Sequence, residues 1–217
     1  MSDSDQQYYE RVRALLEDSY LAADARGDVF GASGCGAKSA AHWEARRRAI
    51  ADAFDSDGTW LDVGCANGLL METLAAWVAD KGYRIEPYGL DLSERIAATA
   101  RRRLPRWADR IWTGNVMDFE PPIRVDYVTA LADAVPEHRI TDMIARLATR
   151  FLKPGGRLVL SCYTPGAFLV NRAGDPTSAP GLLRAGGFEP AGDTQARDAQ
   201  SGIIKAWVAW TDIGARS

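Results

Sequence analysis

The stretch that most constrains the fold is residues 59–68, Thr-Trp-Leu-Asp-Val-Gly-Cys-Ala-Asn-Gly. Its first half is a short, β-prone apolar run, and Gly64 interrupts that run. Asn67 and Gly68 then lead into apolar residues at helical spacing, beginning at Leu69. The sequence therefore predicts a strand, a glycine turn and a helix. In α/β proteins this arrangement brings a ligand to the N-terminus of a helix.

The rest of the chain repeats this alternation of strands and helices. Strands are expected near residues 59–63, 83–90, 110–116, 125–131, 157–162, 188–198 and 202–211, and helices near 67–80, 94–104, 136–151 and 180–185. Such alternation predicts an α/β, doubly wound, mostly parallel sheet with helices on both faces. The last two strands are only a few residues apart, so they should pair as a hairpin. The final strand is then antiparallel to the others.

Two further helices are expected before the first core strand, at residues 5–25 and 39–54. Between them, Gly31–Lys38 has so many small residues that we expect a mobile loop with no packed element. We therefore expect residues 1–55 to form an N-terminal helical cap over one edge of the sheet, and residues 56–217 to form the core. A chain of 217 residues is long enough for one domain with a full-sized core.

The composition of the chain indicates which cellular compartment and which binding partners to expect. The net charge of −3 gives no global field that would recruit nucleic acid or an acidic membrane surface. The three cysteines (Cys35, Cys65 and Cys162) are too few and too scattered for a disulfide framework, and no metal site is expected. The polar N-terminus does not resemble a secretory signal, and no apolar run reaches membrane-spanning length. We expect a cytoplasmic protein, a monomer or homodimer, with no nucleic-acid or membrane partner.

Polar residues fall at the carboxyl ends of three successive predicted strands. Asp62 and Gly64 follow the first, Asp91 the second, and Asn115 with Val116 the third. In an open doubly wound sheet the ligand crevice lies outside these ends. A carboxylate there can accept hydrogen bonds from both hydroxyls of a ribose, and an asparagine beside apolar residues suits an adenine ring. Together they predict a site for a cofactor that contains adenosine.

The turn sequence indicates which adenosine cofactor is expected. Gly64-Cys65-Ala66-Asn67-Gly68 is not a G-x-G-x-x-G motif, and no Gly-Lys-Ser/Thr follows it, so both common phosphate-binding signatures are missing. Asp62, just before the turn, would repel a pyrophosphate but attract an ammonium group. This favours S-adenosylmethionine, whose tail carries an amino group and a carboxylate.

Four segments, in this order and at these spacings, resemble the class I S-adenosylmethionine-dependent methyltransferases. They are D-V-G-C-A-N-G at 62–68, G-L-D-L-S at 89–93, G-N-V-M-D at 114–118 and L-K-P-G-G-R-L at 152–158. The resemblance covers roughly residues 39–212. It implies a seven-stranded sheet with an antiparallel last strand, with S-adenosylmethionine as cofactor and S-adenosylhomocysteine as product. Ala66 stands where many members have glycine, and we expect a tighter turn there with no loss of binding.

The resemblance also implies roles for individual residues. The methionine part of the cofactor is expected at Asp62, Gly64, Ala66 and Gly68, the ribose at Asp91, and the adenine at Leu92, Asn115 and Val116. Cys65, Met117 and Leu131 complete the set expected around the cofactor.

The acceptor of the methyl group is less constrained. Candidate bases near the mouth of the site are His138, Asp133, Tyr163 and His42, and candidate substrate contacts are Trp43 and Tyr20. The sequence alone does not distinguish these roles from a solvated surface position for the polar candidates or from core packing for the aromatic ones. The chain has no extra domain for a large partner and no Asn/Asp-Pro-Pro-Tyr/Phe sequence after the fourth strand, so a small molecule methylated on oxygen or nitrogen is expected. A protein or RNA acceptor, and a catalytically silent cofactor-binding subunit, remain as alternatives.

Overall fold

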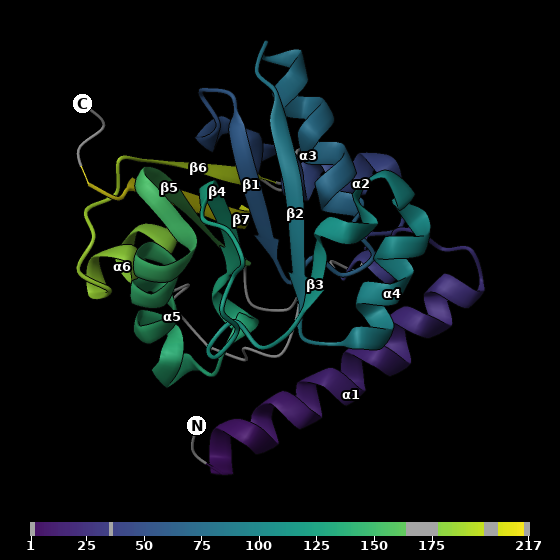
Figure 1. The fold of residues 1–217 in the computed structure, drawn as a ribbon. Helices are drawn as coiled ribbons and strands as arrows, with labels where there is room; N and C mark the ends of the chain where they lie inside the picture. Colours follow the sequence, from purple (N-terminus) through teal and green to yellow (C-terminus); the bar gives the residue numbers. More distant parts are fainter. Residues whose placement is uncertain (1–2, 35–36, 164–177, 198–203, 215–217) are drawn as a thin grey trace.

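A seven-stranded sheet forms the centre of the computed structural model, which describes residues 3–34, 37–163, 178–197 and 204–214 (Figure 1). The strands are β1 Gly58–Val63, β2 Ile85–Asp91, β3 Ile111–Thr113, β4 Val125–Leu131, β5 Leu152–Tyr163, β6 Gly192–Arg197 and β7 Ile204–Asp212. Their order is β3-β2-β1-β4-β5-β7-β6. The first five strands are parallel, and β7 is antiparallel to both of its neighbours, β5 and β6. The predicted fold class is confirmed.

Helices cover both faces of the sheet because successive strand residues point to opposite sides. The helices are α2 Ala40–Arg47, α3 Leu69–Asp80 and α4 Glu94–Arg103 on one face, and α5 Ile140–Arg146 and α6 Ala179–Ala185 on the other. In β1, Trp60 packs into the first layer and Leu61 into the second. Each layer has its own cluster of buried apolar side chains, so the sheet is sealed on both sides.

The predicted helix at residues 136–151 is less regular than its spacing indicates. A 3₁₀ turn spans Glu137–Arg139, α5 follows, and a π-helical turn spans Leu147–Phe151. Strand β5 also differs from the prediction, because it begins at Leu152, before the Pro154-Gly155-Gly156 sequence. The pairing of β4 with β5 shifts register between Val125 and Tyr127, so Pro154-Gly155-Gly156 forms a bulge in β5.

The segment before β1 packs into the core. After α2 the chain continues in 3₁₀ turns over Arg48–Ala53. Trp43, Ile50 and Phe54 are almost completely buried in the same cluster as β1 and α3. The division at residue 55 stays a prediction, but residues 40–54 are structurally continuous with the sheet.

Helix α1, Asp3–Ala25, has a different position. It runs across the ends toward which the arrows of β1 and β2 point (Figure 1). Ion pairs attach it near both ends, from Asp5 to Arg139 at 2.8 Å and from Asp24 to Arg102 at 2.9 Å. It therefore covers the edge of the sheet where a ligand is expected.

The loop after α1 corrects one expectation. Gly31–Ser33 forms a 3₁₀ turn with Ala32 and Ser33 buried, where no packed element was expected. The Gly31 N–H donates to Asp28 Oδ1 at 2.9 Å, which fixes the turn. Cys35 lies outside the described residues. No helix in the described part of the chain is long and apolar enough to cross a membrane.

Candidate active site

The turn after β1 leaves bare backbone facing open space. Gly64 has φ 82°, and no atom lies within 4 Å of where its Cβ would be. Its N–H donates to Leu90 O at 2.7 Å, which ties the turn to β2. At Gly68, the residue before α3, φ is 75° and a Cβ would stand 2.5 Å from Leu104 Cδ1. Glycine is required at the first position for conformation and at the second also for packing.

Ala66 adopts the left-handed conformation, with φ 47°, and is the one non-glycine residue with positive φ in the described part of the chain. This region costs a residue with a Cβ roughly 1–2 kcal/mol. A hydrogen bond from the Ala66 N–H to Asp91 Oδ2, at 2.9 Å, holds the strained residue in place. Ala66 thus adopts a backbone conformation that favours glycine, the residue that many members of the resembled family have here; the tighter turn stays a prediction.

Asp91 is buried at the end of β2 and is held by backbone donors. Oδ2 accepts from Ala66 N and Oδ1 from Ser93 N, each at 2.9 Å. Burial raises the pKa of Asp91 to about 6, and these two hydrogen bonds partly oppose the effect. Each carboxylate oxygen can accept a second hydrogen bond. The side chain lines a cavity, so it can receive the two hydroxyls of a ribose.

Asp62, on β1, is also buried. Its Oδ1 accepts from Thr129 Oγ1 at 2.9 Å, and that hydroxyl accepts from Trp60 Nε1 at 2.9 Å. Burial raises the pKa of Asp62 to about 7, while Thr129 and the positive charge of Arg47 lower it. The hydrogen bond from Thr129 thus orients the Asp62 carboxyl, and the pKa of this carboxyl depends on the charge of Arg47.

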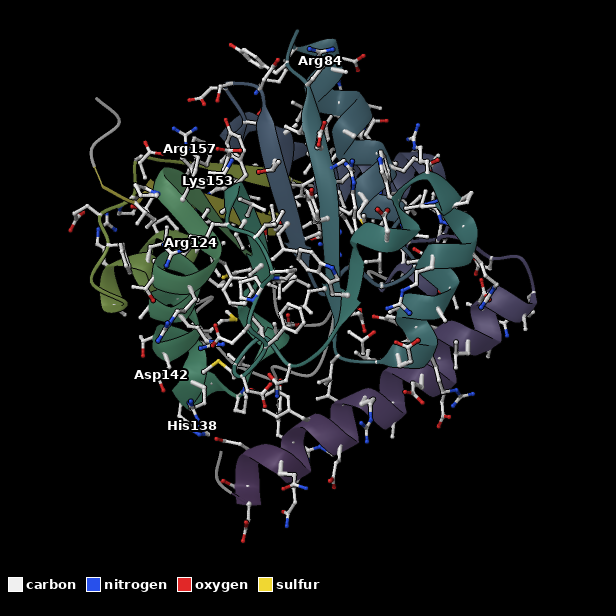
Figure 2. All side chains as sticks on the ribbon, in the orientation of Figure 1. Arg84, Arg124, His138, Asp142, Lys153 and Arg157 are labelled. Atoms are coloured by element: carbon white, nitrogen blue, oxygen red, sulfur yellow. The ribbon has the colours of Figure 1, made fainter. Side chains whose placement is uncertain are left out.

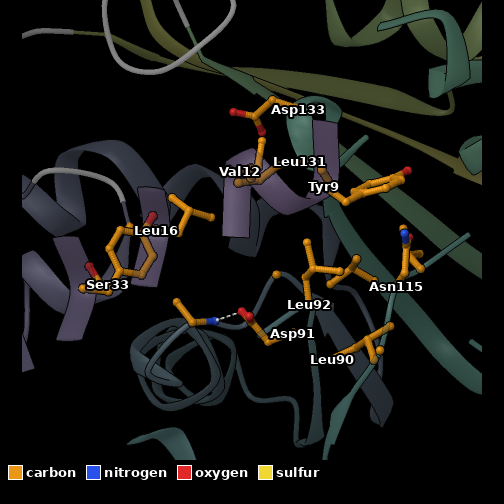
Figure 3. Close-up of a pocket in the computed structure, with 18 of the residues that line it drawn as sticks. Tyr9, Val12, Leu16, Ser33, Leu90, Asp91, Leu92, Asn115, Leu131 and Asp133 are labelled. Atoms are coloured by element: carbon orange, nitrogen blue, oxygen red, sulfur yellow. Dashed lines mark hydrogen bonds between the residues drawn. The ribbon is translucent and has the colours of Figure 1, made fainter. Parts of the chain in front are cut away.

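A cavity of about 150 Å³ lies between α1 and the carboxyl ends of the strands (Figure 3). A smaller cavity of about 20 Å³ adjoins it, and both are lined by Ser33, Arg47, Val63, Gly64 and Leu131. Of the residues expected around the cofactor, Gly64, Ala66, Asp91, Leu92, Asn115, Val116 and Leu131 line the larger cavity. Asp62 and Cys65 line the smaller one, and Gly68 and Met117 line neither.

Asn115 is preorganised at the end of the larger cavity beside β3. Its Oδ1 accepts from Met117 N at 3.0 Å, and its side chain hydrogen-bonds to Tyr9 of α1. Burial raises the pKa of Tyr9. In Figure 3, Tyr9, Asn115 and Leu90 lie together on one side of the cavity, with Asp91 between them and Ser33. A flat, weakly polar ring such as adenine fits this end.

The acceptor candidates separate into two groups. Asp133 and Tyr20 line the larger cavity. Asp133 is half-buried, and this partial burial raises the pKa of its carboxyl. Trp43 lines the smaller cavity, and its Nε1 donates to Thr73 Oγ1 at 3.0 Å.

The two histidines line neither cavity. The side chain of His138 is 63% exposed and its Nε2 is 2.9 Å from Asp5 Oδ1; Figure 2 shows it beside the amino end of α1. His42 Nδ1 accepts from Lys38 N at 3.4 Å. The side chain of Tyr163 lies outside the described residues.

Sequence reasoning missed part of the cavity wall. Tyr9, Val12 and Leu16 of α1 line it, as do Arg46 and Arg47 at the end of α2. The helical spacing of the α1 residues was a signal that one face of this helix is buried, but spacing does not say against what. The two arginines belong to a run of three, and a run of charges gives no sign that some members point inward.

Comparison with known proteins agrees with this geometry. Residues 61–156 match the model of a methyltransferase domain. Trans-aconitate 2-methyltransferase of Methylobacterium nodulans is 33% identical over 130 residues, 58% of this chain and 48% of that protein, so the match spans about half of the relative's length.

Two solved structures share the fold. One is the 1,6-didemethyltoxoflavin-N1-methyltransferase of Burkholderia thailandensis, solved with 1,6-didemethyltoxoflavin and S-adenosylhomocysteine bound. It has a TM-score of 0.66 and 20% identity, over 99% of this chain and 92% of that one. The other is the geranyl diphosphate C-methyltransferase of Streptomyces coelicolor A3(2), with a TM-score of 0.61 and 17% identity over 95% and 98% of the two chains.

The residues of the site fit S-adenosylmethionine. A buried carboxylate faces the place for a ribose, open backbone lies at Gly64, and a second buried carboxylate stands where an ammonium would bind. The chain therefore carries a methyltransferase domain at residues 61–156, and its sheet and site agree with the resemblance to the class I S-adenosylmethionine-dependent methyltransferases.

Proposed function

We propose that this protein transfers a methyl group from S-adenosylmethionine to an oxygen or nitrogen atom of a small molecule. The observation that carries the proposal is the cavity beneath α1, which has Asp91 on one wall and Asp133 on another. A single cavity thus holds a ribose-binding carboxylate and a polar group that can face an acceptor.

The binding roles follow from the contacts. Asp91, fixed by two backbone N–H groups, accepts hydrogen bonds from the ribose hydroxyls. Asn115 and Tyr9 present polar edges to the adenine, with Leu92 and Val116 beside its face. The backbone at Gly64 lies against the methionine part. These groups are held before binding, so little freedom remains to be lost.

The sulfonium of the cofactor supplies an electrophilic methyl group, so the protein's main task is to hold an acceptor in line with it. The acceptor is placed beside Leu131, Asp133 and Ala134, at the end of β4. Burial raises the pKa of the Asp133 carboxyl, which makes its carboxylate a better proton acceptor. Asp133 therefore takes the proton of a hydroxyl acceptor, whereas an amine acceptor can react without it.

A small acceptor is supported by the covering helix. Tyr9, Val12, Leu16 and Tyr20 of α1 close the cavity on one side, which leaves room for a compact molecule. The names of the related proteins described above each state a small-molecule acceptor: trans-aconitate, 1,6-didemethyltoxoflavin and geranyl diphosphate. We further propose a cytoplasmic protein, a monomer or homodimer, that does not bind nucleic acid, in keeping with its net charge of −3.

Transfer of labelled methyl tests this function. The protein is incubated with S-adenosylmethionine labelled in its methyl group and with a cell extract separated by dialysis into small and large molecules. We expect label in the small-molecule fraction with wild type, strong loss with Asp91→Ala, and no loss with Asp109→Ala, an exposed control. Label in the large-molecule fraction would point to protein or RNA. Intact binding of S-adenosylhomocysteine with no transfer to either fraction would favour a silent cofactor-binding subunit.

A further inference from the structure

Glu17 of α1 contacts the start of α4, just after the carboxyl end of β2 (Figure 1). Its Oε1 accepts a hydrogen bond from Ser93 Oγ at 2.6 Å, and its Oε2 lies 3.0 Å from Arg95 Nη1. The side chain of Glu17 is 16% exposed, whereas that of Arg95 is 68% exposed. Because water weakens an ion pair to an exposed partner, the hydrogen bond from Ser93 is the more important contact of Glu17.

Ser93 connects Glu17 to the carboxylate at the end of β2. Ser93 is buried, and its N–H donates to Asp91 Oδ1 at 2.9 Å. Its hydroxyl donates to Glu17 and accepts from the Ile96 N–H at 3.2 Å, which caps α4. Without Glu17, the buried hydroxyl would lose its acceptor, and an unsatisfied buried group is costly. The position of the Ser93 N–H that orients Asp91 therefore depends in part on α1.

The Asp91 carboxylate is thus held from two sides. Its Oδ2 accepts from Ala66 N in the turn after β1, the bond that Figure 3 shows as a dashed line, and its Oδ1 is held from the start of α4. Leu16 and Tyr20, near Glu17 on α1, line the larger cavity, but Glu17 itself lines neither cavity. Any effect of Glu17 on a bound ligand must therefore pass through its neighbours.

We propose that Glu17 is a positioning residue for the cofactor: it holds Ser93 and, through Ser93, orients the Asp91 carboxylate that accepts the ribose hydroxyls. The proposal rests on the role in ribose binding proposed above for Asp91, and extends it to the covering helix. With α1 in place, Asp91 is held ready for the ribose, and such preorganisation raises affinity because less freedom is lost on binding. Recognition of the ribose then depends on a residue outside the cavity.

Isothermal titration calorimetry with two ligands tests this proposal. The ligands are S-adenosylhomocysteine and its analogue without the 2′- and 3′-hydroxyls, and the ratio of their dissociation constants measures recognition of the ribose. In wild type we expect the analogue to bind roughly 10- to 100-fold more weakly. Glu17→Ala should lower this ratio roughly 3- to 10-fold, because S-adenosylhomocysteine loses affinity and the analogue does not.

Two further variants separate the hydrogen bond from other effects of the substitution. Glu17→Gln keeps a carbonyl oxygen that can accept from Ser93, so it should retain most of the wild-type ratio. Glu10→Ala makes the same change of residue at an exposed position of α1 and should leave both affinities unchanged.

Each other result has a definite meaning. If the ratio in Glu17→Ala equals that of wild type, the proposal is wrong even where both ligands bind more weakly, because Glu17 then only fastens α1. A loss in Glu17→Gln as large as that in Glu17→Ala would also overturn it, since the charge and not the hydrogen bond would be responsible. If wild type binds the two ligands equally, the proposed role of Asp91 itself is wrong, and this inference fails with it.

Discussion

At the scale of single residues, the site depends on a turn whose backbone is held in a costly conformation. Ala66 has φ 47°, and its N–H is fixed by Asp91. The hydrogen bond therefore couples the conformation of the turn to the carboxylate that faces the ribose. Strain of this kind persists where the surroundings over-determine the backbone, which is common at binding sites.

Replacing Ala66 with glycine tests this strain. Relief of roughly 1–2 kcal/mol in the left-handed region should outweigh the roughly 0.5–1 kcal/mol that glycine loses in chain entropy. We expect Ala66→Gly to raise the free energy of unfolding by up to about 1 kcal/mol, measured by urea denaturation. Ala75→Gly, in the right-handed backbone of α3, should instead lower it. A loss of stability in Ala66→Gly would contradict the strain argument.

The buried carboxyl of Asp62 should make stability depend on pH. Its pKa is raised from 3.8 to about 7, so between these values the folded state keeps a proton that the unfolded chain releases. The unfolding free energy of wild type therefore falls, through this group, as pH rises from about 4 to about 7. Asp62→Asn removes the contribution and can still accept the Thr129 hydrogen bond.

Denaturation of wild type and Asp62→Asn across pH 4–8 measures this effect. We expect the mutant to gain stability relative to wild type as pH rises through that window, with no further change above it. Asp109→Asn, an exposed substitution, should follow wild type throughout. A difference between mutant and wild type that is constant with pH would show that Asp62 titrates at its ordinary value.

At the scale of elements, the two α-helices before β1 have different structural roles. Helix α1 lies over the cavity and is attached by ion pairs near its ends. Helix α2 and the turns after it bury Trp43, Ile50 and Phe54 in the core. We therefore propose that α1 is the cover of the site and that residues 40–54 belong to the folded core.

Two truncations test that division. Removal of residues 1–25 should leave a cooperatively folded protein that binds S-adenosylhomocysteine weakly, because Tyr9 and its neighbours are gone from the cavity wall. Removal of residues 1–55 should abolish cooperative unfolding, since loss of each large core side chain costs roughly 3–5 kcal/mol. Circular dichroism melts of the two truncated proteins measure their unfolding, and titration with S-adenosylhomocysteine measures binding to the longer one. If the protein without residues 1–55 melts cooperatively near the wild-type temperature, residues 40–54 are not part of the folded core. The predicted boundary at residue 55 would then be correct.

At the scale of the whole molecule, the sequence predicts the sheet well because alternation and turn residues are local signals. The glycine turn, Asp91 and Asn115 are found where strand ends place them. The inward direction of Arg47 and the closure of the cavity by Tyr9 are not local. They depend on where α2 and α1 pack, which no spacing within either helix determines. For the same reason the exposed position of His138 could not be separated from a catalytic one.

A crystal structure of the protein with S-adenosylhomocysteine tests the account most directly. We predict adenine between Leu92 and Asn115, both ribose hydroxyls on Asp91, and the amino-acid tail beside Gly64 and Asp62. The thioether sulfur should face Asp133 across the place for an acceptor. A ligand bound outside the cavity beneath α1, or bound there with its ribose away from Asp91, would contradict the account.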